Sequence, residues 1–161
     1  MKKIILFSIV LISNLTFSQN DSNSLALDIY NRRFELSKPL VLPDYPVFKD
    51  LQLNTIWECL NTLEIMYNVK EKIDFTDIRN QIFDRLKEMA TILANEGTYF
   101  YLSNGFECYN WTLEKNKNYL ETRELYKCIG DCSTSIGFRE GIDILNKTTK
   151  SIQESKKKIK N

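Results

Sequence analysis

The chain has 161 residues, of which 43% are hydrophobic, and its 22 basic and 21 acidic residues leave a formal net charge of +1. This balance lacks the basic footprint of a protein that binds nucleic acid. The chain contains no histidine, which excludes a histidine-based catalytic triad, a histidine general base and a histidine metal ligand. We therefore expect neither a cofactor nor a metal site, and a binding protein rather than an enzyme.

Residues 1–18 have the layout of a cleavable secretory signal peptide. Two lysines are followed by an apolar run over residues 4–12, and Thr16 and Ser18 place small side chains at the −3 and −1 positions of a cut. The apolar run is much shorter than the roughly 20 residues of a membrane-spanning helix. The sequence therefore predicts an exported protein, periplasmic or extracellular, in which residues 19–161 form a single helical domain with no integral membrane segment. An uncleaved N-terminal anchor is the alternative.

A short helix is expected over residues 25–36, because Ser24 can cap its N-terminus. The next segment, residues 37–49, contains all three prolines of the chain. Each proline lacks an amide donor and keeps the preceding residue out of the helical region. Because the segment is also rich in apolar residues, and exposed apolar patches are uncommon on soluble monomers, we predict an extended strap packed across the helices. The alternative is a rigid strand that is offered to a partner.

Three longer segments show the three- and four-residue spacing of apolar side chains that is typical of helices. The first covers residues 51–70 and is apolar on most of its surface, which favours a central position. The second begins near Asp74 or Thr76 and ends before Gly97, which suits the left-handed position after a helix. The third follows the last cysteine and continues toward the C-terminus with a heptad-like seam. The predicted fold class is mainly all-α, a compact bundle of about four to five helices.

Residues 98–112 are ambiguous. Asn104 and Gly105 lie between two aromatic-rich runs, which is a signal for a single β-hairpin. Two strands alone are only marginally stable in water, so a helical start with a break at this dipeptide is the alternative. Residues 113–127 are then expected to form a polar helix with Tyr126 turned inward.

Four cysteines, an even number in a chain with an export signal, favour two structural disulfides. They are Cys59, Cys108, Cys128 and Cys132. Of the three possible pairings, we favour Cys128–Cys132, since Gly130 lets that loop turn tightly, together with Cys59–Cys108. A redox or metal site is disfavoured, because C-x-x-x-C is not the oxidoreductase spacing and zinc sites draw on two close cysteine pairs or on histidines.

Aromatic residues are concentrated between positions 99 and 126, and most of them are tyrosine or tryptophan. Core filling is the simplest use of such residues. Tyrosine and tryptophan also suit contact surfaces, because they combine a large apolar area with a polar tip. We therefore predict a contact surface that uses Tyr99, Tyr101, Tyr109 and Trp111.

The export signal, the expected disulfides and the lack of a catalytic motif favour a non-catalytic protein. Such a protein would bind another exported or cell-envelope protein, in the manner of an inhibitor or an immunity protein. The alternative is a carbohydrate- or lipid-binding module that uses the aromatic cluster at 99–126. An enzyme that relies on carboxylates alone would need two of them in one cleft. The sequence leaves the oligomeric state open.

Overall fold

The computed structural model describes residues 21–42, 48, 51–69, 74–130 and 135–160, and the predicted signal peptide lies outside them. Residues 21–31 are helical. The prediction of a mainly helical fold is confirmed, with a small two-stranded sheet added. The elements that follow the first helix are α2 (Ile56–Asn68), α3 (Thr76–Asn95), β1 (Tyr99–Ser103), α4 (Cys108–Asn116), α5 (Tyr119–Thr122), β2 (Glu124–Cys128) and α6 (Ile136–Lys160).

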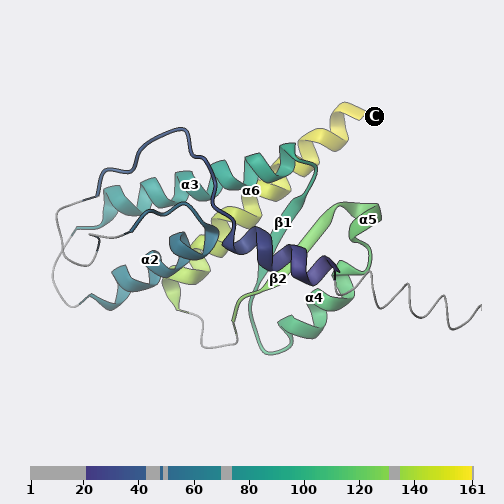
Figure 1. Cartoon of the computed structure of the whole chain (residues 1–161), viewed down its shortest axis with the longest axis horizontal. Helices are drawn as coiled ribbons and strands as arrows, with labels where there is room; N and C mark the ends of the chain where they lie inside the picture. Colours follow the sequence, from purple (N-terminus) through teal and green to yellow (C-terminus); the bar gives the residue numbers. More distant parts are fainter. Residues whose placement is uncertain (1–20, 43–47, 49–50, 70–73, 131–134, 161) are drawn as a thin grey trace, which may run out of the picture.

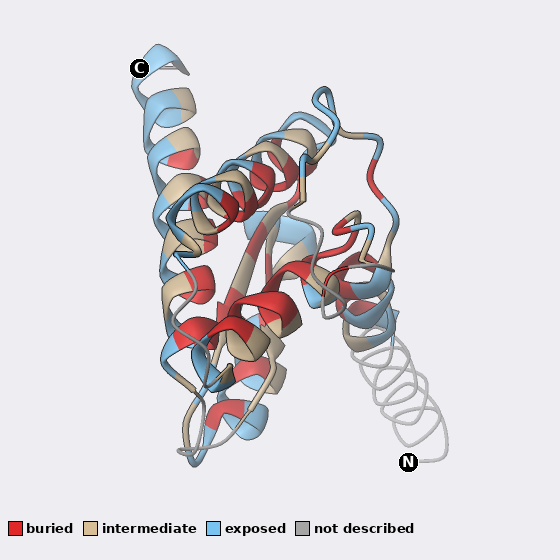
Figure 2. Ribbon diagram, turned by 90° about the vertical axis from the view of Figure 1, so that its left-hand side faces the viewer, coloured by how far each residue is buried: buried red, intermediate tan, exposed pale blue. Residues whose placement is uncertain are grey.

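One apolar core holds the helices against the sheet. In Figure 1, α2, α3 and α6 lie together on one side of the two strands, and α4 and α5 lie on the other. Figure 2 shows that the buried parts of the helices face inward, toward one another and toward the strands. The largest fully buried side chains are Phe48, Leu53, Ile56, Leu60, Leu63, Ile82, Leu86, Met89, Leu93, Phe100, Leu125 and Leu145.

The first described helix covers residues 21–31 and not 25–36, so that Ser24 lies inside it rather than at its cap. Ala26 and Ile29 are buried on its inner face. Their three-residue spacing places both side chains on one side of the helix. The helix is therefore amphipathic as expected, but it is displaced by about one turn toward the N-terminus.

α2 begins at Ile56, later than the helix expected over residues 51–70, because the preceding turn cannot be helical. Leu53 has a φ of +52°, a left-handed conformation that a right-handed helix excludes. Thr55 then caps α2: its Oγ1 accepts the N–H of Glu58 at 2.9 Å, and Glu58 Oε2 accepts the N–H of Thr55 at 3.0 Å. This reciprocal capping box fixes the start of the helix.

α3 and α6 agree well with the apolar spacing of the sequence. Gly97 follows α3 with a φ of +90°, as predicted for the residue after a helix. α6 packs so close to α2 that a Cβ atom added to Gly137 would lie only 2.5 Å from the backbone oxygen of Leu63. The inner seam of α6 is fully buried at Leu145 but ends before Ile159, which is 84% exposed. Over the described ranges, none of the helices combines the length and the apolar character needed to cross a membrane.

The described part of the predicted strap, residues 37–42, is irregular and lies along α3. The N–H of Ser37 donates to Glu88 Oε1 at 2.8 Å. The side-chain amide of Gln81 bonds both polar groups of Val41: its Oε1 accepts the N–H at 3.2 Å, and its Nε2 donates to the carbonyl at 3.3 Å. These residues follow α3 as the predicted strap would, and most of the remainder of the strap lies outside the described part.

β1 and β2 form a parallel sheet, in which Tyr99 pairs with Glu124 and Ser103 pairs with Cys128. The predicted β-hairpin at 98–112 is therefore wrong. After β1 the chain enters α4 and not a second strand, so the Asn-Gly turn ends a strand and starts a helix. Parallel strands need a long crossover connection, and α4 and α5 supply it.

The polar helix expected over residues 113–127 is wrong in its second half. α4 ends at Asn116, and Arg123 ends α5 with a left-handed φ of +61°. The chain is extended from there, and Leu125 of β2 is fully buried. A five-residue strand in which only one side chain is buried presents too short an alternation to be separated from a helix by sequence pattern alone.

The disulfide joins Cys108, the first residue of α4, to Cys128, the last residue of β2. Their Cα atoms lie 5.4 Å apart, because β2 ends beside the start of α4. Cys59 is a free thiol in the core, where Sγ donates to the carbonyl of Leu53. The predicted pairing of Cys59–Cys108 and Cys128–Cys132 is therefore wrong, and Cys132 itself lies outside the described residues.

We expect the Cys108–Cys128 bond to contribute about 3 kcal/mol to the free energy of unfolding, the chain-entropy value for a loop of this size. The double variant C108S/C128S tests this in chemical denaturation, with and without a reductant. Reductant should destabilise the wild-type protein by a similar amount and leave the double variant unchanged. Equal stability of the oxidised wild type and the double variant would contradict the prediction.

Candidate functional site

Two side-chain amides form hydrogen bonds to the outer edges of the two-stranded sheet. Asn146 of α6 bonds the outer edge of β1: its Oδ1 accepts the N–H of Leu102 at 2.9 Å, and its Nδ2 donates to the same residue's carbonyl at 2.8 Å. Asn116 of α4 bonds Tyr126 of β2 in the same way: its Oδ1 accepts the N–H at 2.8 Å, and its Nδ2 donates to the carbonyl at 2.9 Å. Each amide replaces part of a missing neighbouring strand, so the sheet is a fixed platform.

The two faces of the sheet differ in character, because side chains alternate along a strand. Phe100 and Leu102 of β1, with Leu125 of β2, are buried in the core. Tyr101 and Tyr126 lie opposite each other in the register and point to the other face. The sheet therefore has an apolar inner face and an outer face rich in tyrosine.

Three aromatic rings and one ammonium group form a continuous surface on this outer side. The rings of Tyr101 and Tyr126 stack with centroids 5.1 Å apart and an angle of 18°. The ring of Trp111, from α4, meets Tyr126 edge-on at 5.0 Å, and Lys115 Nζ lies 5.6 Å from the Trp111 ring. We call Tyr101, Trp111, Lys115 and Tyr126 the aromatic surface.

The four residues of the predicted contact surface do not form one patch. Tyr101 and Trp111 both contact the ring of Tyr126. Tyr99 lies on the same face of β1 as Tyr101, but it lines an adjacent pocket. Tyr109 is 67% exposed, but it is two residues from Trp111 on α4 and so faces nearly the opposite way. Sequence reasoning missed the role of Tyr126. The alternation of Glu124 to Cys128 was the only signal that could have revealed it.

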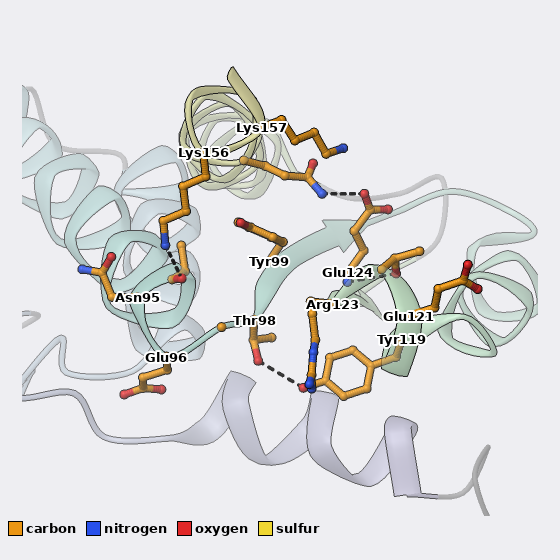
Figure 3. Close-up of a pocket in the computed structure, with 14 residues that line it drawn as sticks. Asn95, Glu96, Thr98, Tyr99, Tyr119, Glu121, Arg123, Glu124, Lys156 and Lys157 are labelled. Atoms are coloured by element: carbon orange, nitrogen blue, oxygen red, sulfur yellow. Dashed lines mark hydrogen bonds between the residues drawn. The ribbon is translucent and has the colours of Figure 1, made fainter. Parts of the chain in front are cut away.

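A polar pocket of about 690 Å³ adjoins the aromatic surface, at the N-terminal ends of both strands. Figure 3 shows that Lys156 and Lys157 enter it from α6, opposite Tyr119 and Arg123. Its side chains include three cations and three carboxylates. The polar lining consists of Asn95, Glu96, Thr98, Tyr99, Tyr119, Glu121, Thr122, Arg123, Glu124, Gln153, Lys156 and Lys157.

Internal hydrogen bonds hold the pocket walls. Lys156 Nζ donates to the carbonyl of Ala94 at 2.7 Å, at the C-terminal end of α3, where the helix dipole favours a cation. The hydroxyl groups of Thr98 and Tyr119 lie 3.1 Å apart in a hydrogen bond. These contacts tie α3 to α6, and the start of β1 to α5, so that the pocket is preformed.

Glu124 is the half-buried carboxylate of the pocket, whereas Glu96 and Glu121 are exposed. Its carboxylate accepts hydrogen bonds from Gln153 Nε2 at 2.6 Å and from the Tyr126 hydroxyl at 2.8 Å. Burial alone would raise the pKa of Glu124, and these two hydrogen bonds oppose that effect. With the charges of Lys157 and Lys115 nearby, the pKa of this carboxyl lies below its usual value. Glu124 is therefore a fixed anion that links the pocket to the aromatic surface.

The tyrosines of the aromatic surface are poor proton acceptors. Burial, together with the charge of Glu124, raises the pKa of Tyr101 to about 12. Burial and the hydrogen bond to Glu124 also raise the pKa of Tyr126. Both phenols stay protonated at neutral pH, so they can donate hydrogen bonds but do not serve as general bases. No cluster of three metal-ligating side chains occurs among the residues that the structure describes.

Comparison of the chain with protein-family models, with curated proteins and with solved structures finds no match.

We predict that Glu124→Gln destabilises the protein at pH 7, because the ionised form is the one that Gln153 and Tyr126 stabilise. Since the pKa of Glu124 is lower in the folded than in the unfolded state, its contribution is complete above the unfolded value of about 4.3. The contribution is lost as the pH falls through the lower, folded value. The stability gap between wild type and E124Q should therefore narrow below about pH 4.3.

Chemical denaturation at a series of pH values measures this gap. The matched control is Glu121→Gln, which removes an exposed carboxylate from the same pocket. It should change the stability at pH 7 less than E124Q does. A gap that is constant down to pH 3 would contradict the role given to Glu124.

Proposed function

We propose that this chain is an exported, non-catalytic binding protein, and that its aromatic surface contacts another protein of the same compartment. The proposal includes a blocking role, as an inhibitor or an immunity protein has. The observation that carries it is the state of Trp111, whose side chain is 44% exposed although its ring is held by Tyr126 and Lys115. A rigid, half-exposed tryptophan is the kind of side chain that dominates protein interfaces.

The rigidity of α4 supports this proposal, because a preorganised surface loses less conformational entropy on binding. The disulfide from Cys108 fixes the first turn of α4 to β2. Asn116 fixes the last turn to the same strand. Trp111 lies between these two attachment points.

The surroundings of Trp111 indicate the chemistry of the partner. Phe106, just before α4, is 89% exposed, whereas the exposed Tyr109 faces the other side of α4. Exposed aromatic residues such as Trp111 and Phe106 are typical of interaction sites. Lys115 adds a positive charge next to Trp111. A partner that presents an apolar group bordered by a carboxylate fits this surface.

Two further features support export. The layout of residues 1–18 is that of a signal peptide. A disulfide such as Cys108–Cys128 persists mainly in oxidising compartments, outside the cytoplasm.

The test is a comparison of the two tryptophans of the chain. Both are 44% exposed, but Trp57 packs against Tyr30 and Phe138, far along the chain from the aromatic surface. Residues 19–161 are immobilised, and envelope proteins of the source cells that bind in stoichiometric amount are identified and purified. We expect Trp111→Ala to weaken the affinity for the purified partner at least about thirtyfold, as a hot spot of about 2 kcal/mol requires.

Trp57→Ala should leave the affinity within about twofold, since it removes an equally exposed ring elsewhere. Circular dichroism and thermal unfolding check that both variants are folded. The proposal fails if no purified envelope protein binds, or if both variants lower the affinity for that protein equally.

Carbohydrate binding is a second candidate, favoured by the pocket at the N-terminal ends of the strands. Tyr99 and Tyr119 line it beside Glu124 and Gln153, and sugar sites combine aromatic faces with such polar groups. The pocket volume of about 690 Å³ lies in the range of small-molecule sites.

We expect this candidate, if correct, to give a signal with neutral cell-wall or plant-type oligosaccharides in isothermal titration. Tyr99→Ala should abolish that signal, while Tyr109→Ala, which removes an exposed tyrosine outside the pocket, should retain it. A glycan panel without any binding would exclude the carbohydrate reading and leave the protein-binding proposal intact.

A further inference from the structure

A second cavity, of about 810 Å³, lies between α3 and the irregular segment at residues 33–42. It is separate from the aromatic surface and from the pocket beside β1, with which it shares no lining residue. One of its walls carries Arg85 of α3, which is only 7% exposed. A buried guanidinium is costly unless it is paired, so the partners of Arg85 decide what the cavity can do.

Among the described residues, Arg85 has three hydrogen-bond acceptors, and all three are uncharged. Nη1 donates to the carbonyl of Leu53 and to the amide oxygen of Asn54, each at 3.4 Å, and Nη2 donates to the carbonyl of Lys38 at 3.2 Å. These are long contacts for a charged donor, which typically lies about 2.7–2.9 Å from a carboxylate. Within the described part of the chain, no carboxylate forms an ion pair with Arg85.

A guanidinium has five N–H donors, so two of those of Arg85 are left over. They are the Nε–H and the second Nη2–H, for which the described residues supply no acceptor. Nε–H and one of the two Nη2–H bonds point outward from the same edge of the planar guanidinium group. A pair of donors in this arrangement matches the two oxygens of a carboxylate.

The other cavity residues include two further cations and several apolar side chains, beside the polar Ser37, Gln52 and Asn54. Arg33 and Lys38 add two positive charges, against one carboxylate, Glu35. The apolar part of the wall contains Phe34, Pro39 and four leucine side chains that are half-buried and packed against the core, namely Leu36, Leu40, Leu42 and Leu51. The cavity thus combines a buried cation with an aliphatic surface.

We propose that this cavity binds an organic carboxylate with an aliphatic chain, of the size of a medium-chain fatty acid. The carboxylate accepts hydrogen bonds from Nε and Nη2 of Arg85, and the chain lies against the leucine side chains. Inorganic phosphate or a short acid would use the cation but leave the apolar wall uncovered. An alcohol of the same length would cover the wall but leave the guanidinium without a counter-charge.

The experiment is isothermal titration of residues 19–161, freed of co-purified lipid, with decanoate. Acetate and decanol at equal concentrations separate the contributions of the charge and of the chain. We expect decanoate to bind in a one-to-one ratio and to raise the thermal unfolding temperature. Acetate and decanol should each bind at least tenfold more weakly.

Two variants locate the site. Arg85→Gln removes the charge and should lower the affinity for decanoate at least tenfold. Because Arg85 also holds Lys38 and Leu53, R85Q could lose its fold, which circular dichroism would reveal. Lys38→Glu avoids this problem, since the Lys38 side chain is exposed and a carboxylate at the cavity rim repels the ligand. K38E should lower the affinity for decanoate at least threefold. The control Lys158→Glu makes the same change in charge on an exposed residue of α6 and should leave that affinity unchanged.

The proposal is overturned if decanoate does not bind, or if acetate or decanol binds as well as decanoate. It is also overturned if folded R85Q, or K38E, binds decanoate like the wild type. A Trp111→Ala variant should bind decanoate normally, so that failure here is distinguishable from failure of the protein-binding proposal.

Discussion

The fold depends on how the protein closes the edges of a sheet that has only two strands. A parallel pair leaves a row of unpaired peptide groups on each outer edge, and such a pair is only marginally stable by itself. The side-chain amide of Asn146 bonds the backbone N–H and carbonyl of Leu102, as a third strand would. Asn116 does the same for Tyr126. Because these amides belong to α6 and α4, the same bonds that complete the sheet also fix a helix along each edge. The aromatic surface exists because Asn116 and the Cys108–Cys128 disulfide hold α4 against β2.

The same device recurs at the strap, where the Gln81 amide bonds both polar groups of Val41. In all three places a single side-chain amide bonds the N–H and the carbonyl of one residue outside a helix. The core can then remain helical, with α2 and α6 in close contact at Gly137. The strap is attached by polar bonds from α3 and not by close apolar packing alone. This leaves room for a cavity beneath it.

The sequence predicted the parts of this fold that depend on local spacing. The end of α3 at Gly97 and the long α6 follow from apolar periodicity and from one glycine conformation. The parallel pairing of β1 with β2 does not, because it joins segments about 25 residues apart, and local turn signals favour the hairpin. The disulfide was missed for the same reason: the register that brings Cys128 beside Cys108 is a property of the sheet. Cys59 is a buried thiol on the inner face of α2, so the pairing with Cys108 that the sequence favoured does not form.

Arg85 is the residue whose position local stability explains least. It lies on α3 next to the apolar face of Ile82, Leu86 and Met89, and a leucine there would extend that face. Burial of an ion that has no counter-ion costs on the order of several kcal/mol, and three long bonds to uncharged oxygens offset only part of that. Two of these bonds hold the strap at Lys38 and the left-handed turn at Leu53. Uncharged donors could hold those carbonyls, but only a cation leaves a charged fork that faces a cavity. The chemistry of the group and its place in the fold together favour a ligand that supplies the missing negative charge.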